Sequence, residues 1–416
     1  MQYDTNSCPV HWERAIALID MNCFFAAVEM QDFPDLRGKP LAITNGSQGT
    51  CIITCSYEAR AYGIKTGMRL KEARKLCPEL LQRPTRPHVY ADMSARIMRA
   101  LHDVCPDMEI FSVDEAFIDM TPCQSLYGSP GYIGRLLKQA VFDATGLPCS
   151  IGISGDKTTA KYAAKLNKPD GFTIIPPWEA RQRLANAPVT ELCGIAGGIG
   201  RFLAERGVHV CGDMQHLPIG ELARHFGNSG RRIWYMAQGL DPDPLHLDVA
   251  DPKTLGHGKV LPPKTVDKEV LLTYLIHMAV RVCARLRRHQ FEAAEFYIGL
   301  LINNQWLGRR VKTSSPTNDT QTLIHLCKYV LNDIHNGQPV YQVQITALNP
   351  RRENCQLDLF IDSEYNQQQS KVNAVMDSIN QRYGESTVGP GRLINKSEMP
   401  SVIAPSWKPG GHRQSI

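Results

Sequence analysis

The sequence predicts an α+β protein of several domains, the first of which has a ferredoxin-like sheet. Its 416 residues exceed what one ordinary core holds, so two to four domains are expected. An apolar share of 43% and a charged share of 21% are typical of a globular chain. Strand and helix patterns in the first half follow the order β–α–β–β–α–β, which is that of a ferredoxin-like sheet.

Hydrophobic periodicity predicts the elements of this first domain. The stretch AIALIDMNCFFAAVEM starts as an apolar strand that ends at Asp20 and continues as a helix. The runs MEIFSVD and EAFIDM together predict a hairpin with Asp114 and Glu115 at its tip. A helix over residues 132–145, the strand CSIGIS and a helix that begins near Lys157 complete the order.

Shifts in composition divide the rest of the chain. A helical segment with glycine-rich turns is followed by a Pro-rich break, DPDPLHLDVADPK. We expect this break and the adjoining LGHGKVLPPK to form a linker. Beyond it, the strands FYIGLLI and VYQVQITAL and two helices predict a second α+β domain. The final segment is polar, with one amphipathic helix around Val372 and Val375. The predicted divisions are 14–29 with 91–175 for the first domain, 30–90 for an insertion in it, 176–245 for a helical domain, 253–352 for the second α+β domain and 353–416 for the tail.

The charge and the cysteines limit the class of protein. The net charge is +5, but 14 Lys or Arg and 6 Asp or Glu between Lys253 and Arg352 give that domain +8 and leave −3 for the rest. A positive domain suits a polyanion such as DNA, although solubility alone would also explain it. No run approaches the ~20 apolar residues of a membrane helix, and the first residues lack a secretory pattern. The 13 cysteines include no CxxC pair and fit reduced core thiols, so a cytoplasmic protein without membrane contact is expected.

The strand end at Asp20 and the hairpin tip at Asp114 and Glu115 are the strongest candidates for chemistry. Two divalent ions about 4 Å apart can activate a hydroxyl and hold a triphosphate. Magnesium prefers oxygen ligands, so two or three carboxylates and one backbone carbonyl suffice. An isolated SVDE in a hairpin would be only a polar turn, so the neighbouring motifs decide between the two interpretations.

Four motifs occur in order along the chain, namely DMNCFFAAVE, SYEARAYGIKTGM, FSVDEAF and SIGISGDKTTAKYAAKLNKPDGF. In order and spacing they resemble those of the Y-family translesion DNA polymerases, over roughly residues 14–360. The resemblance implies that the first domain is a palm, its insertion the fingers, the helical domain a thumb and the basic domain a little finger. VYADMSARIM and the tail helix resemble UmuC-like members, whereas DMNCFFAAVE is closer to the DinB or DNA polymerase IV branch.

The resemblance assigns the catalytic centre. It implies that Asp20, Asp114 and Glu115 are the metal ligands, that the carbonyl of Met21 is a further ligand and that the cofactor is two Mg²⁺ ions. One departure is Asn22, where many relatives have another Asp. Because that position is outside the ligand set, the departure affects fine tuning rather than catalysis.

The resemblance also implies the residues that bind the nucleotide. Phe25 falls on the steric-gate position, where an aromatic ring would collide with a ribose 2′-hydroxyl, and Phe24 is expected to present its backbone N–H to the triphosphate. Lys161 and Lys165 recur at i+4 spacing and are expected to form a solvated or DNA-facing stripe. The residues expected to bind the phosphates are Tyr57, Arg60, Lys157 and, as a weaker candidate, Thr54.

Other motifs point to DNA. TELCGIAGGIGRFLAERGV resembles a helix-hairpin-helix, in which the turn from Gly194 to Gly197 would let backbone N–H groups approach a phosphate. A dinucleotide fingerprint is the competing interpretation of GGIG, but no strand precedes it and residue 203 is leucine. In the basic domain, phosphate contacts are expected from Arg281, Arg285, Arg288, Arg309, Arg310 and Lys312.

A short peptide after the basic domain predicts a protein partner. Gln356-Leu357-Asp358-Leu359-Phe360 resembles the bacterial sliding-clamp peptide, and an apolar anchor packed on its own domain is the alternative. The expected partners are primer–template DNA, deoxynucleoside triphosphates, the sliding clamp and, in the UmuC branch, a UmuD-like subunit. The chain is expected to act as a monomer.

The expected function is error-tolerant, template-directed DNA synthesis opposite damaged bases, without proofreading. A non-catalytic adaptor that links the clamp to repair proteins is the alternative, because some Y-family relatives have lost the carboxylates. A nucleotide cyclase shares the palm chemistry but is marked by a GGDEF-type turn. Here all three carboxylates are present and the sequence contains no GGDEF.

Overall fold

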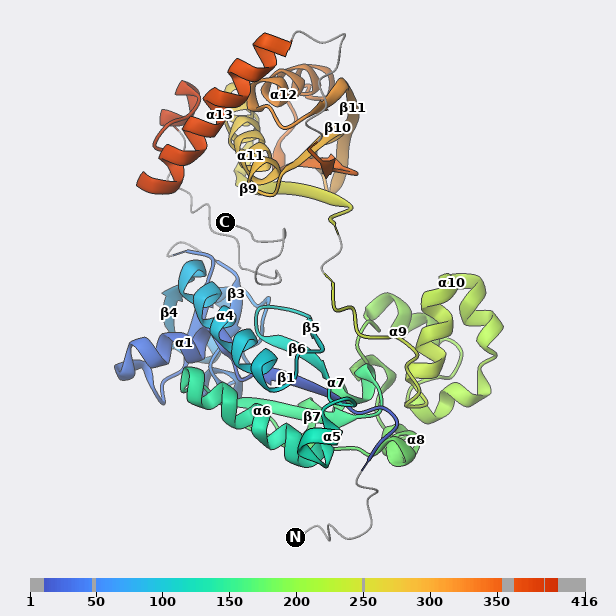
Figure 1. The fold of residues 1–416 in the computed structure, drawn as a ribbon. Coiled ribbons are helices and arrows are strands. Elements are labelled where there is room, and N and C mark those ends of the chain that lie inside the picture. Colours follow the sequence, from blue (N-terminus) through green and yellow to red (C-terminus); the bar gives the residue numbers. More distant parts are fainter. Residues whose placement is uncertain (1–10, 47–49, 249–250, 354–362, 385, 396–416) are drawn as a thin grey trace. The chain divides into compact units, whose positions relative to one another are not determined.

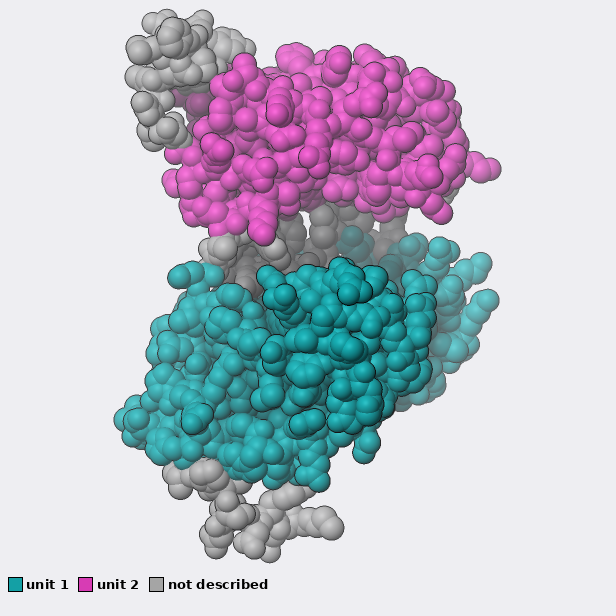
Figure 2. All heavy atoms as spheres, turned by 90° about the vertical axis from the view of Figure 1, so that its right-hand side faces the viewer, with its two compact units in different colours: residues 1–249, 400–416 teal, residues 250–399 magenta. Residues whose placement is uncertain are grey.

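The computed structural model describes residues 11–46, 50–248, 251–353, 363–384 and 386–395. Its contacts divide the chain into two compact units, residues 1–249 with 400–416 and residues 250–399 (Figure 2). Each unit has its own hydrophobic core, which confirms the α+β, multidomain prediction. In the described part of the chain, no helix has the length and apolar character needed to cross a membrane.

The first unit is built around a five-stranded sheet with the order β5-β6-β1-β7-β8 (Figure 1). Its central strand β1 (Ile16–Met21) pairs antiparallel with β6 (Glu115–Asp119) and β7 (Cys149–Ser154). The edges are β5 (Met108–Ile110) and β8 (Phe172–Ile174). Without β8, the order and the connecting helices are those of a ferredoxin-like sheet, as the sequence predicted.

Helices cover both faces of this sheet (Figure 1). One face carries Ala17 and Ile19 and packs against α1, α4 and α6, whereas the other carries Leu18 and packs against α7. Because side chains alternate along a strand, Asp20 at the end of β1 belongs to the α7 side. The bounds are α1 (Phe24–Asp32), α4 (Pro87–Val104), α5 (Gln124–Tyr127), α6 (Pro130–Thr145) and α7 (Lys157–Leu166).

The close approach of α7 to the sheet requires a glycine. A Cβ atom added at Gly152 in β7 would lie 2.2 Å from the carbonyl oxygen of Ala160 and 2.2 Å from the amide nitrogen of Ala164. Both neighbours are helix backbone, which cannot move aside as a side chain could. Gly152 therefore lets α7 lie directly on β7.

The insertion and the helical segment have smaller cores of their own. The insertion forms a three-stranded sheet with the order β3-β2-β4, to which two short helices are added. Its elements are β2 (Leu41–Thr44), β3 (Ile52–Cys55), α2 (Tyr57–Ala61), α3 (Leu70–Leu76) and β4 (Leu81–Pro84). The helical segment contains α8 (Ala180–Leu184), α9 (Gly197–Ala204) and α10 (Ile219–Met236).

The second unit is an antiparallel sheet with the order β11-β10-β12-β9. The face that carries Phe296 and Ile298 packs against α11 and α12, and the opposite face carries polar residues such as Gln342 and Gln344. The bounds are β9 (Thr254–Thr265), α11 (Lys268–Arg288), β10 (Phe291–Ile302), β11 (Gln305–Thr317), α12 (Thr320–Ile334), β12 (Val340–Leu348), β13 (Arg351–Arg352) and α13 (Ser363–Tyr383).

The linker expectation for LGHGKVLPPK was wrong, because residues 254–265 form β9. The polar run after residue 304, for which the sequence predicted no element, forms β11. Both are edge strands, which tolerate proline and exposed polar side chains because they pair on one side only. The predicted tail helix is present as α13, but its apolar residues are only partly covered, since Met376 and Ile379 are half-buried and Val375 is 59% exposed. The buried side chain on α13 is Asn373, and Asp377 pairs with Arg287 at 2.6 Å.

Candidate functional site

Three acidic residues lie where β1 ends and the β5–β6 hairpin turns. Asp20 and Glu115 are directly opposite partners in the ladder between β1 and β6. The amide of Met21 donates a hydrogen bond of 3.0 Å to the carbonyl of Asp114, which fixes the hairpin turn beside the end of β1. The structure therefore brings together the acidic residues that the sequence singled out.

Each of these carboxylates has an internal partner. Lys161 Nζ lies 2.9 Å and 2.8 Å from the two oxygens of Glu115. The hydroxyl of Ser112 donates to Asp114 Oδ1 at 2.6 Å. The partners are thus the ammonium of Lys168 for Asp20, the ammonium of Lys161 for Glu115 and the hydroxyl of Ser112 for Asp114.

The donor chemistry of this cluster suits a hard divalent cation, since carboxylate oxygens are preferred ligands of Mg²⁺. Burial raises the pKa of Asp20 to about 7 against the opposing charge of Lys168, and the charges of Glu115 and Asp114 add to the rise. Burial also raises the pKa of Asp114. Among the described residues, however, no three His, Cys, Asp or Glu side chains are gathered closely enough to hold a metal ion. The ligand types fit a divalent cation, but two of the three carboxylates, those of Asp20 and Glu115, are paired with lysine ammonium groups.

Two aromatic residues begin the helix that follows β1. The ring of Phe25 stacks on the ring of Tyr90 in α4, with centroids 4.4 Å apart and planes inclined by 13°. Phe25 is 7% exposed and Phe24 is 2% exposed. The stack therefore fixes the orientation of the Phe25 ring five residues after Asp20.

The expected phosphate-binding residues of the insertion lie on α2 and β3. The guanidinium of Arg60 lies 4.7 Å from the centroid of the Tyr57 ring. The hydroxyl of Tyr57 lies 3.5 Å from Asn22 Oδ1, which also accepts a hydrogen bond of 2.9 Å from Ser150. Thr54 is half-buried in β3. Asn22 thus connects α2 to the end of β1 through its side-chain oxygen.

Lys157 does not have the surroundings expected of a phosphate ligand. It is 4% exposed, and its Nζ lies 2.7 Å from Glu109 Oε2, 2.8 Å from Asp243 Oδ2 and 3.2 Å from the carbonyl oxygen of Pro244. An ammonium has three donors, and these acceptors use all three. Lys157 instead joins α7 to β5 and to segment 241–246, so its assignment to the triphosphate is corrected.

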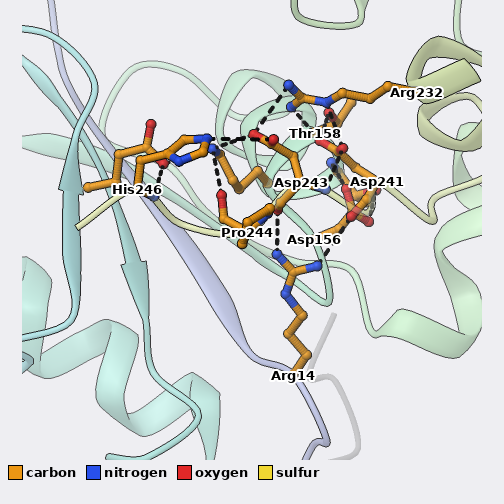
Figure 3. Close-up of polar contacts among 11 residues, drawn as sticks. Arg14, Asp156, Thr158, Arg232, Asp241, Asp243, Pro244 and His246 are labelled. Atoms are coloured by element: carbon orange, nitrogen blue, oxygen red, sulfur yellow. Dashed lines mark hydrogen bonds and ion pairs between the residues drawn. The ribbon is translucent and has the colours of Figure 1, made fainter. Parts of the chain in front are cut away.

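Further polar contacts hold segment 241–246, as Figure 3 shows. Asp241 accepts hydrogen bonds from Arg232 at 2.8 Å and from Thr158 at 2.7 Å. Arg14 donates to the carbonyls of Asp241 and Asp243 at 3.2 Å and 2.7 Å. Burial alone would raise the pKa of Asp241, but the hydrogen bonds from Arg232 and Thr158 hold it below its ordinary value. The segment is therefore fastened to α7, α10 and the start of the sheet.

Lys168 is the cation at the carboxylate cluster that the sequence reasoning missed. It follows α7 within LNKPDGF, and its ammonium forms an ion pair with Asp20. A lysine beside the proline at the end of the fourth motif was the available signal. The resemblance was instead carried over to Lys157, because that lysine begins the helix that follows CSIGIS.

The expected helix-hairpin-helix has an open turn. Gly194 has a φ of +90°, a conformation that favours glycine. Apart from adjacent residues of the same segment, no described atom lies within 4 Å of a Cβ added at Gly194 or Gly197. Gly197 is the first residue of α9, so the turn leads directly into a helix N-terminus.

The arginines expected on α11 differ from one another. Arg281 lies 2.8 Å from His257 Nε2, and Arg285 donates to the carbonyl of Gly256 at 3.1 Å. Burial lowers the pKa of Arg285 to about 10, and the charges of Arg281 and Arg288 add to this. Arg285 is therefore engaged inside the second unit, whereas Arg288 is exposed.

The basic cluster on β11 is divided between the two faces of its sheet. Arg309 pairs with Asp333 of α12 at 2.7 Å, so it lies on the helix side. Arg310 and Lys312 are exposed and, by the alternation along the strand, lie on the opposite, polar face. The three residues therefore do not form one surface.

Comparisons with known proteins agree with one another. Residues 19–165 match the family model described as the impB/mucB/samB family, and residues 252–359 match its C-terminal domain. DNA polymerase IV of Moorella thermoacetica is 33% identical over 388 residues, which are 90% of this chain and 94% of that protein. DNA polymerase IV of Shewanella woodyi is 41% identical over 229 residues, 55% of this chain and 63% of that protein. A solved Y-family DNA polymerase chimera, 24% identical, has the same fold with a TM-score of 0.72 and covers 82% of this chain and 100% of its own.

Proposed function

The chain belongs to the impB/mucB/samB family of Y-family DNA polymerases, and from this premise we propose how its own residues carry out the reaction. It is a DNA-directed DNA polymerase of the translesion type, whose substrates are primer–template DNA and deoxynucleoside triphosphates. The alternative of a non-catalytic adaptor is not favoured, because all three acidic residues of the catalytic motifs are present.

Asp20, Asp114 and Glu115, with the carbonyl of Met21, would hold two Mg²⁺ ions. The observation that carries this assignment is the pairing of Asp20 with Glu115 across β1 and β6, beside Asp114 in the hairpin turn. When bound, such ions activate the primer hydroxyl and stabilise the charge that develops on the triphosphate. The protein's part is to hold the oxygens of the two strands at one end of the sheet.

The nucleotide would lie between the carboxylates and the insertion. Phe25, held by its stack on Tyr90, is the proposed gate against the ribose 2′-hydroxyl. Arg60 and Tyr57 are the proposed phosphate ligands from α2, because a guanidinium offers a fork of donors that fits phosphate oxygens. Lys168 replaces Lys157 as the proposed lysine for the triphosphate, since its ammonium lies beside Asp20.

Contacts with DNA and with other proteins are further proposals. The open turn from Gly194 to Gly197 and the exposed side chains of Arg310 and Lys312 suit phosphate contacts without sequence preference. The proposed clamp peptide, Gln356–Phe360, lies outside the described residues. Binding of a UmuD-like subunit, a monomeric state and a cytoplasmic location with the DNA complete the proposal.

Primer extension with the purified chain tests the catalytic assignment. Wild-type protein should extend a primer only when Mg²⁺ is present, and Asp114→Asn with Glu115→Gln should reduce extension to background. Asp119→Asn is the matched control and should retain activity, because Asp119 is at the opposite end of β6 from Glu115 and its carboxylate accepts a hydrogen bond of 2.9 Å from the nearby amide of Thr121. Synthesis that survives the double substitution would remove these carboxylates from the mechanism.

A further inference from the structure

Lys161 and Glu115 form an ion pair on the face of the first sheet that α7 covers. The ammonium lies 2.9 Å and 2.8 Å from the two carboxylate oxygens, and the two side chains are 14% and 18% exposed. A cation that contacts both oxygens occupies the position at which a metal would bind the carboxylate in bidentate fashion. Lys161 is therefore not part of a solvated or DNA-facing stripe, as its i+4 spacing had suggested.

The surroundings of Lys161 fix the position of its charge. Its Nζ lies 4.3 Å from the centroid of the Phe111 ring, an arrangement that attracts a cation to the ring face. Phe111 packs edge-on against Phe117, with centroids 5.4 Å apart. On either side of Lys161 along α7, Ala160 and Ala164 pack against the sheet. The ammonium is thus held by both the helix and the hairpin.

Glu115 needs a counter-charge because it lies opposite Asp20 and directly follows Asp114. Carboxylates that share one strand end repel one another when no cation is present. The side chain of Glu115 has three rotatable bonds and would turn away if nothing opposed this repulsion. Lys161 supplies the opposing charge.

We propose that Lys161 is a built-in counter-cation that occupies Glu115 in the metal-free polymerase and that a divalent ion must displace. The proposal rests on the proposed function of Glu115 as a metal ligand. Lys161 acts through Glu115 and is a positioning residue rather than a catalytic one. It keeps the carboxylates together between turnovers, and it raises the concentration of divalent ion that the free enzyme needs.

Mn²⁺ binding to the free, full-length protein, measured by electron paramagnetic resonance without DNA or nucleotide, tests the proposal. Lys161→Met keeps most of the apolar stem and removes the charge, so the Kd for Mn²⁺ should fall by at least about fivefold when the competing cation is gone. Lys161→Arg keeps a cation and should bind Mn²⁺ as the wild type does. Lys165→Met is the matched control one helical turn further on, where the lysine is 41% exposed and pairs with Glu191, and should leave the Kd unchanged.

Unchanged or weaker Mn²⁺ binding by folded Lys161→Met would overturn the proposal that Lys161 is a counter-cation of Glu115. Lys161→Gln is the second neutral variant if the methionine variant does not fold, and the same tightening is expected from it. Glu115→Gln distinguishes a failure of the proposed metal-ligand function of Glu115 from a failure of the proposed counter-cation function of Lys161. If this variant binds Mn²⁺ as well as the wild type does, Glu115 is not a ligand and its proposed function fails. If it loses binding while Lys161→Met leaves the Kd unchanged, only the counter-cation fails.

Discussion

Replacing Lys157 would decide whether its buried network stabilises the first unit or serves the nucleotide. Lys157→Met removes an ammonium that is 2.7 Å from Glu109, whose side chain is 6% exposed. Glu109 would keep the amide of His246 as a donor at 2.9 Å, but its charge would lose the lysine. Removing one partner of a buried ion pair costs about 3–5 kcal/mol. The free energy of unfolding of the first unit should fall by that amount.

A double-mutant cycle isolates the pair. Glu109→Gln removes the charge that Lys157→Met leaves behind, so the double variant should lose at least about 1 kcal/mol less than the two single losses combined. Urea unfolding followed by hydrogen exchange in β5 and α7 measures the first unit by itself. Lys165→Met, which breaks a largely exposed pair, should cost no more than about 1 kcal/mol.

The opposite result is equally informative. A loss below about 1 kcal/mol in Lys157→Met, together with a raised KM for the deoxynucleoside triphosphate, would contradict the structural role. That result would instead support the role of Lys157 as a phosphate ligand, as the sequence suggested. A large loss of stability with an unchanged KM in the folded fraction is the expected outcome.

Two further predictions concern the gate and the second unit. Phe25→Ala should admit ribonucleotides while deoxynucleotide insertion continues, and unchanged sugar discrimination in single-nucleotide insertion assays would place the gate elsewhere. Burial, with the charges of Arg281 and Arg285, lowers the pKa of His257 to about 2. Below about pH 6.5, His257 is therefore protonated in the unfolded state but stays neutral in the folded state. Stability of the second unit should therefore fall by about 2 kcal/mol between pH 7.5 and pH 5. His257→Gln should remove that part of the pH dependence, and an equal slope in urea titrations of the variant would refute the assignment.

The sequence predicted the elements whose burial imposes a pattern. β1, β10 and β12 are apolar runs because both neighbours and a helix layer cover them, and α11 and α12 show helical periodicity. β9 and β11 carry prolines, glycines and charges because each has a neighbouring strand on one side only. Their strand character comes from pairing partners far away in the sequence, which local patterns do not encode.

The same limit applies to the site. The order of the motifs located Asp20, Asp114 and Glu115, because strand ends and hairpin tips are local features. The directions of Lys157 and Lys168 depend on how the end of α7 and segment 241–246 pack, so the sequence alone could not show that Lys168, and not Lys157, pairs with a carboxylate of the cluster. Arg309 was grouped with its neighbours although alternation along β11 sends it to the helix side.

The helix α7 joins two parts of the first unit that the sequence treats separately. Lys157 and Lys161 are one turn apart, about 6 Å along the axis. Lys157 binds Asp243 in segment 241–246, which follows the helical segment, and Lys161 binds Glu115 in the β5–β6 hairpin. At Gly152, the backbone of α7 packs directly against β7, so the helix cannot move closer to the sheet. α7 therefore links the two parts rigidly, and a displacement of segment 241–246 would reach the proposed catalytic carboxylate of Glu115 within a single helical turn.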